Sequence, residues 1–123
     1  MTLVKFLLIL IIMVITESRK IGPPTRTKDV ETVIVYEGKS TKLVCPIYGE
    51  PQPIIEWEKD GEEIDYSWER IMTEGNYLAI KKVQSSDTGV YICRGVNGFG
   101  TEKAKLELVV AGKFAYNQNK SEY

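Results

Sequence analysis

The chain has 123 residues, enough for one domain, with 16 basic and 17 acidic residues and a formal net charge of −1. Charges of both signs are interspersed, so bulk electrostatics gives no support for nucleic-acid binding. The sequence contains no histidine, the commonest general acid–base group and metal ligand, which lowers the expectation of hydrolytic or metal chemistry. We therefore expect neither a cofactor nor a metal ion.

The first 18 residues have the character of a signal peptide. The apolar run FLLILIIMVI, from Phe6 to Ile15, is too short for a membrane span, which needs about 20 residues. Thr16 and Ser18 then stand at positions −3 and −1 of a cleavage site that leaves Arg19 as the first mature residue. The alternative is an uncleaved signal anchor. Because no second long apolar run follows in the sequence, we expect no membrane span in the mature chain and predict a secreted, extracellular protein, where a disulfide persists.

Residues 19–29 read as an extended lead-in, and residues 30–111 show apolar residues that alternate over short stretches bounded by turn residues. This pattern predicts strands at residues 32–36, 40–46, 54–59, 76–82, 89–96 and 101–110. The stretch between the third and fourth of these is irregular and is expected to hold short edge strands. Residues 112–123 read as a flexible polar tail.

About seven short strands, each with one inward face, predict an all-β fold of the antiparallel sandwich type. We expect the strands at 32–36, 40–46 and 76–82 to form one sheet. The strands at 54–59, 89–96 and 101–110 are expected to form the other, with Asn97-Gly98-Phe99-Gly100 turning the last hairpin.

The segment SSDTGVYICRGVNGFG, residues 85–100, places Asp87, Gly89, Tyr91 and Cys93 at every second position. One interpretation is a reactive cysteine with a carboxylate partner. No base such as histidine is available to activate that thiol, however. The chain has only one other cysteine, Cys45, which permits one intramolecular pairing and a structural interpretation.

The spacing Cys45…Trp57…Cys93, joined to Asp87-x-Gly89-x-Tyr91-x-Cys93, makes the chain resemble the I-set immunoglobulin family. The resemblance implies one disulfide between Cys45 and Cys93 that joins two sheets and packs on Trp57. It implies that Tyr91 forms a tyrosine corner. The residues expected in the structural core are Leu43, Trp57, Leu78, Tyr91 and Leu106.

Further positions fit the same family. The loop Gly49–Pro53 and the hairpin Asn97-x-x-Gly100 look like the I-set in particular. Arg70 stands where such domains place an arginine that pairs with the aspartate before the tyrosine, here Asp87. Gly89 is expected to mark the turn into its strand.

A narrower resemblance concerns the run from Cys45 to Gly100 and the lead-in Gly22-Pro23-Pro24, which look like the first immunoglobulin domain of the fibroblast growth factor receptor-like family. That family has three extracellular immunoglobulin domains, a membrane span and a short cytoplasmic tail without a kinase. Its growth factor and heparin contacts lie mainly on the later domains, so ligand binding is not carried over. A small secreted protein with one such domain, of the kind used on neuronal surfaces, fits the length better.

The outward positions of the second predicted sheet are the main candidates for partner binding. They combine one apolar residue with mixed charges, and the hairpin tip adds an aromatic ring: Ile92, Arg94, Lys103, Lys105, Glu56, Glu58 and Phe99. An apolar centre within a polar rim is typical of a protein-recognition surface. The alternative is that Ile92 is an ordinary exposed residue and that Phe99 folds back over its own hairpin.

Two groups of charges are weaker candidates. The acidic group, Glu56, Glu58, Glu62, Glu63 and Asp65, suggests acid–base or calcium chemistry, but its spacing is not that of a calcium loop and a solvated rim is favoured. The basic group comprises Arg26, Lys28, Lys39, Lys42, Lys81 and Lys82. Within it, Lys42 and Lys81 are a candidate heparin site, although scattered surface lysines are the favoured interpretation.

Two further residues complete the candidates. Trp68 lies in the irregular stretch and is interpreted as packing on the sandwich edge rather than binding a partner. Asn119 opens the sequon Asn119-Lys120-Ser121, a glycosylation signal in the predicted tail.

The expected function is that of a secreted recognition protein, not an enzyme, which binds cell-surface or matrix proteins. Modulation of growth factor receptor signalling and neuronal cell adhesion are the roles considered. The alternative is a matrix protein held by heparan sulfate. An unusual hydrolase has no supporting triad in this sequence.

Overall fold

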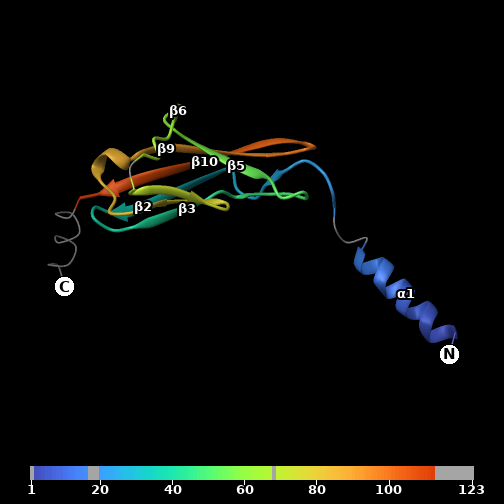
Figure 1. Cartoon of the computed structure of the whole chain (residues 1–123). Helices are drawn as coiled ribbons and strands as arrows, with labels where there is room; N and C mark the ends of the chain where they lie inside the picture. The colour runs from blue at the N-terminus through green and yellow to red at the C-terminus, as the bar shows by residue number, and fades with distance from the viewer. Residues whose placement is uncertain (1, 17–19, 68, 113–123) are drawn as a thin grey trace, which may run out of the picture.

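Short strands separated by turns build most of the chain, as the alternating pattern predicts (Figure 1). The structure is a computed structural model and describes residues 2–16, 20–67 and 69–112. In chain order its elements are α1 (Thr2–Thr16), β1 (Thr25–Arg26), β2 (Val30–Tyr36), β3 (Thr41–Val44), β4 (Ile47–Tyr48), β5 (Ile54–Lys59), β6 (Glu62–Glu63), β7 (Ile71–Glu74), β8 (Tyr77–Ile80), the 3₁₀ helix η1 (Ser85–Asp87), β9 (Gly89–Asn97) and β10 (Gly100–Ala111).

The helix α1 projects from one end of the strands, and β10 ends at the opposite end (Figure 1). The sequence of α1 contains the apolar run Phe6–Ile15, which is interpreted above as the core of a signal peptide. Within the described ranges, no helix is both long and apolar enough to cross a membrane.

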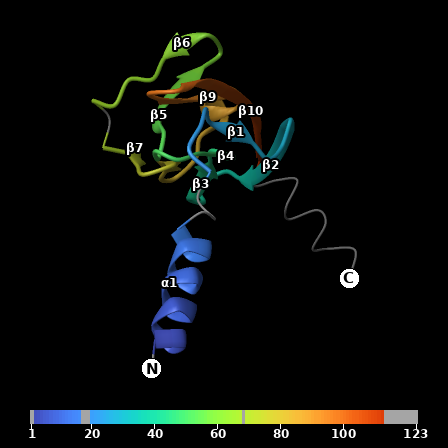
Figure 2. The same cartoon turned by 90° about the vertical axis from the view of Figure 1, so that its right-hand side faces the viewer.

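The strands form two facing layers, seen end-on in Figure 2. One layer is a five-stranded sheet in the order β2-β10-β9-β5-β6, and the other contains the three-stranded sheet β3-β8-β7. A short third sheet pairs β1 with β4. The predicted β-sandwich fold is confirmed.

The first predicted strand does not join the sheet expected for it. β2 pairs with β10, and it runs parallel to β10, with Val33 opposite Leu108 and Val35 opposite Val110. The turn after β2 carries the chain to the other layer, where the Val83 amide donates to the Lys39 carbonyl at 2.7 Å. The prediction was wrong because alternation shows which side chains face inward but not which strand lies alongside.

The core lies between the two layers and is closed by the disulfide between Cys45 and Cys93, whose Cα atoms are 5.9 Å apart. All five residues predicted for the core are buried: Leu43, Trp57, Leu78, Tyr91 and Leu106. Trp57 stands directly opposite Cys93 in the β5–β9 ladder, so its ring lies beside the bridge. A disulfide that closes a loop of 48 residues stabilises the fold by about 4 kcal/mol.

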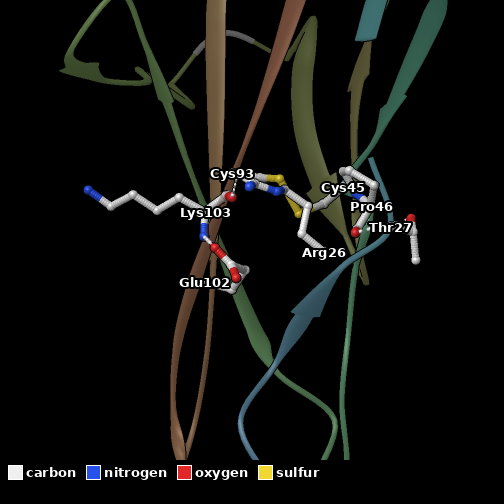
Figure 3. The surroundings of a disulfide bond; sticks show 7 residues. All are labelled: Arg26, Thr27, Cys45, Pro46, Cys93, Glu102 and Lys103. Atoms are coloured by element: carbon white, nitrogen blue, oxygen red, sulfur yellow. Dashed lines mark hydrogen bonds between the residues drawn. A yellow bond between two sulfur atoms is a disulfide. The ribbon is translucent and has the colours of Figure 1, made fainter. Parts of the chain in front are cut away.

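The part of the lead-in from Gly22 onward is held against the sandwich. The side-chain amide of Asn97 donates to the Gly22 carbonyl at 2.9 Å, and β1 pairs with β4. Near the disulfide, Arg26 of β1 reaches across to β10, where its guanidinium donates to the Lys103 carbonyl at 3.1 Å (Figure 3). These bonds link the segment before β2 to β4, β9 and β10.

Candidate functional site

The motif that begins at Asp87 forms a buried polar anchor at one corner of the sandwich. Arg70 donates two hydrogen bonds to the Asp87 carboxylate, at 2.8 and 3.0 Å, and the Gln84 amide donates a third at 2.7 Å. The Tyr91 hydroxyl donates to the Asp87 backbone carbonyl at 2.6 Å, which is the tyrosine corner expected from the resemblance. Asp87 is the one charged residue buried within the described part of the chain.

This anchor shifts the pKa of three of its members, and the hydrogen bond to Asp87 raises the pKa of the Arg70 guanidinium. Burial alone raises the pKa of the Asp87 carboxyl, but the hydrogen bonds from Arg70 and from the Gln84 amide outweigh it, so that pKa lies below its usual value. Burial raises the pKa of the Tyr91 hydroxyl. The Asp87 carboxyl and the Tyr91 hydroxyl therefore keep one protonation state at neutral pH, which suits a structural role.

Gly89 does not sit in the turn that its sequence context predicts. It begins β9, and a side chain added there would place a Cβ 2.6 Å from a carboxylate oxygen of Asp60. That carboxylate accepts a hydrogen bond from the Val90 amide at 2.9 Å, which ties the Asp60-Gly61 turn to β9. The glycine leaves room for this close approach of the Asp60 carboxylate, and no positive φ calls for it.

The outer surface of β5, β9 and β10, called the recognition face below, brings together six of the seven residues predicted for partner binding. Two cross-strand rows cover it. One row consists of Glu58, Ile92 and Lys105, which stand side by side. The next row consists of Glu56, Arg94 and Lys103. The strand alternation and register place all six side chains on the same side of the sheet.

The recognition face has an apolar centre flanked by opposite charges. Ile92 is partly buried between Glu58 on β5 and Lys105 on β10. The charged residues around it are exposed. Such an arrangement lets a partner cover Ile92 while the flanking charges select its orientation.

Phe99 does not belong to this face. It lies in the turn between β9 and β10, seven residues from Ile92, which is about 20 Å along a strand. Its side chain is 58% exposed, and its amide donates to the Asn97 side chain at 3.0 Å. The exposed ring does not cover its own hairpin, contrary to the alternative interpretation.

At the same end of the sandwich the structure shows a feature that the sequence did not reveal. A hollow of about 710 Å³ lies between the lead-in and the loop before β5, and its lining includes Lys20, Tyr48, Pro53, Ile54 and Asn76. Ile54 is 73% exposed, although it begins a strand. Alternation with Trp57 places Ile54 on the outward side of its strand, which was the available signal, but an outward side chain does not by itself indicate a hollow.

The acidic residues spread along the β5–β6 hairpin. Glu58 stands opposite Glu63, and Glu62 stands opposite Lys59. The Asp65 carboxylate accepts the Ser67 amide at 2.9 Å in the following loop. Among the described residues, no group of three or more such side chains is arranged to hold a metal ion.

The basic residues separate into two places. Lys42 and Lys81 line one shallow hollow of about 390 Å³ between β3 and β8, and the Lys42 ammonium lies 4.6 Å from the centre of the Tyr77 ring. Arg26 and Lys28 lie instead on the segment before β2, in ion pairs with Asp29 and Glu31. Arg26 and Lys28 therefore do not lie with Lys42 and Lys81 at the candidate heparin site.

Two sequence candidates, Trp68 and Asn119, lie outside the described residues. The same holds for residues 17–19, which include the predicted cleavage site.

The two-layer fold, the bridge packed on Trp57 and the Tyr91 corner define an immunoglobulin-type domain. The family model for the immunoglobulin I-set domain matches residues 24–110, and the chain belongs to this family.

Among curated proteins, the chain is similar to fibroblast growth factor receptor-like 1 of Gallus gallus, with 34% identity over 108 residues that cover 88% of this chain and 22% of the relative. The Homo sapiens protein of the same name is 38% identical over 90 residues, covering 72% of this chain and 18% of the relative. The chain thus spans about a fifth of the length of these relatives.

Among solved structures, the N-terminal Ig1-2 module of the Drosophila receptor protein tyrosine phosphatase DLAR is similar, with 28% identity and a TM-score of 0.67 over 76% of this chain and 48% of that one. Relatives of this kind support a protein-binding role for the domain.

Proposed function

We propose that the protein is a secreted recognition protein that binds an extracellular protein through the recognition face of β5, β9 and β10, and that it performs no catalysis. The observation that carries this proposal is the position of Ile92, flanked by Glu58 and by Lys105 on the same side of the sheet. An apolar centre with a charged rim is the composition of a non-obligate protein interface. The names of the receptor-like relatives agree with binding at the cell surface.

Secretion is part of the proposal and rests on α1. We propose that residues 1–18 are a signal peptide, that residues 30–111 with the lead-in 19–29 form the immunoglobulin domain, and that residues 112–123 form a polar tail that carries the Asn119 sequon. The test is expression of the full chain in animal cells, followed by N-terminal sequencing of protein from the medium. A first residue of Arg19 supports the proposal, and full-length protein retained on membranes contradicts it.

The recognition face is tested by one substitution with a matched control. The protein is cross-linked to living cells, and captured proteins are identified by mass spectrometry. Ile92→Asp is expected to abolish capture by introducing a charge at the centre of the face, while the melting temperature stays close to that of the parent protein. Val44→Asp makes the same kind of change on the opposite layer, where Val44 is 46% exposed, and should leave capture intact. Capture that survives Ile92→Asp would assign recognition to another face.

The finer roles proposed are modulation of growth factor receptor signalling and neuronal cell adhesion. The proposal is supported by the similarity to fibroblast growth factor receptor-like 1. A receptor or an adhesion protein among the captured proteins decides between the two roles.

A second candidate function is attachment to heparan sulfate. Backbone contacts bring together four lysines, namely Lys39, Lys42, Lys81 and Lys82. The Val83 amide donates to the Lys39 carbonyl, and the Lys82 amide donates to the Ser40 hydroxyl. Lys42 and Lys81 line the hollow beside them. Sulfate groups bind to clustered ammonium charges, and such binding weakens with salt. The test is retention on a heparin column. This candidate is supported if retention falls with salt and with Lys42→Ala and Lys81→Ala. It is contradicted if both substitutions leave retention unchanged.

A further inference from the structure

The charges on the recognition face are sorted by strand. Apart from Glu107 on β10, its acidic residues stand on β5 and its neighbour β6, and its basic residues stand on β9 and β10. This sorting leaves like charges directly opposite each other, since Glu58 faces Glu63 and Arg94 faces Lys103. Like charges at opposed positions destabilise a sheet, so the arrangement has a cost within a single copy.

Few of these charges are compensated inside the molecule. In the part of the chain that the structure describes, no ion pair involves Glu56, Glu58, Arg94 or Lys103, and Lys105 reaches only Glu107, at 3.8 Å between exposed side chains. Glu58 and Lys105 are separated by β9, which is about 10 Å across two strand spacings. These charges therefore remain available to a partner that presents the opposite pattern.

We infer that this partner is a second copy of the same chain, stacked face to face through a twofold axis that runs parallel to β9 and passes over Ile92. Rotation about this axis lays β5 of each copy over β10 of the other. Glu58 then meets the second copy's Lys105, and Glu56 meets the second copy's Lys103. Because a twofold interface repeats every contact, four opposite-charge pairs surround two contacting Ile92 side chains. This inference rests on the proposed function, for which it names the partner.

The alternative orientation is disfavoured by the same charges. A twofold axis that runs across the strands would lay each strand over its own equivalent, so that Glu58 meets Glu58 and Lys105 meets Lys105. Such contacts oppose association. The parallel axis brings only Arg94 near its own equivalent, and each Arg94 there stands beside Glu56 of its own copy.

The geometry is tested by reversing one charge at a time. Protein purified from cells that express the full chain is examined by sedimentation equilibrium up to about 1 mM, where even weak dimers are populated. Glu58→Lys alone, and Lys105→Glu alone, each turn two attractive pairs into repulsive ones and should weaken self-association at least about tenfold. Lys42→Glu reverses a charge on the opposite layer and should have no effect.

The decisive measurement mixes the two variants. In the mixed dimer the introduced lysine of one copy meets the introduced glutamate of the other, the retained Lys105 meets the retained Glu58, and every pair is again of opposite sign. Association should therefore recover in the equimolar mixture, and also in the double variant Glu58→Lys/Lys105→Glu, and it should weaken between about 50 and about 500 mM salt.

Three outcomes would overturn the inference. A protein that stays monomeric at low salt is not a homophilic binder, and a dimer unaffected by Glu58→Lys uses another surface. A mixture that fails to recover contradicts the twofold geometry. If the protein stays monomeric while Ile92→Asp still abolishes capture on cells, the recognition face stands and its partner is a different protein. If Ile92→Asp changes neither dimerisation nor capture, the proposed function fails as well.

Discussion

The buried anchor at Asp87 yields the most direct test of how this fold is stabilised. Replacing Arg70 with methionine keeps an aliphatic stem over the corner and removes both hydrogen bonds to the Asp87 carboxylate. Asp87 is only 4% exposed, so it cannot recover these bonds from solvent. It keeps the bond from the Gln84 amide at 2.7 Å.

Removing one partner of a buried ion pair costs about 3–5 kcal/mol, because a charge is left buried without compensation. The Arg70 side chain is 24% exposed and the Gln84 amide remains, which favours the lower end of that range. We expect Arg70→Met to lower the free energy of unfolding by about 3 kcal/mol. A small domain with a total stability of about 5–15 kcal/mol remains folded after such a loss.

The pH dependence identifies the cause of the loss. In the parent protein the pKa of Asp87 is lowered, so its contribution is present above the unfolded pKa of about 3.9 and is lost as the pH falls through the lower folded pKa. In Arg70→Met the burial remains while the bonds from Arg70 are gone, so the pKa of Asp87 should rise. Protonation then stabilises the variant, and its deficit should shrink below about pH 5.

The assay is urea denaturation with the disulfide intact, at about pH 7 and about pH 4. Arg94→Met makes the same substitution on the exposed face and should change stability by no more than about 0.5 kcal/mol. The reasoning fails if Arg70→Met costs no more than Arg94→Met does. It fails equally if the deficit is the same at both pH values.

Three other substitutions probe the scaffold through the same denaturation assay. Tyr91→Phe leaves the Asp87 carbonyl without its 2.6 Å hydrogen bond and should cost about 1–3 kcal/mol; a smaller loss means that solvent reaches the carbonyl. Gly95→Ala places a Cβ 2.7 Å from an Ile47 methyl group and should cost about 1–3 kcal/mol, whereas Gly98→Ala, with no atom within 4 Å of its Cβ, should be close to neutral. Replacing both cysteines with alanine should cost about 2–5 kcal/mol, and a fully stable variant would show that the bridge is dispensable.

The sequence predicted the core because its rare residues occupy fixed places in one pattern. Two cysteines, a tryptophan between them and a tyrosine two positions before the second cysteine leave few ways to pack. The strands near these residues were predicted well for the same reason. The recognition face followed from alternation, since Cys93 points inward and the residues on either side of it must then point outward.

The sequence could not supply what depends on neighbours far along the chain. Val33 and Val35 of β2 pack against the core, and the parallel pairing of β2 with β10 depends on a crossover between layers that leaves no local signal. Gly89 was interpreted as a turn residue, whereas its smallness serves the approach of Asp60 from the β5–β6 turn. The like-charge pairs of the recognition face likewise became visible only once the register was known.

That register links the scaffold to the proposed site. Cys93 stands opposite Trp57 on one side and Ala104 on the other, and all three point into the core. The same alignment sets Ile92 between Glu58 and Lys105, one position along the strand. A slip of one residue would turn Cys93 outward and break the bridge, because side chains alternate with a period of two. The disulfide therefore fixes not only the core but also which charges flank Ile92, so the recognition face can vary in sequence without any change in the geometry that presents it.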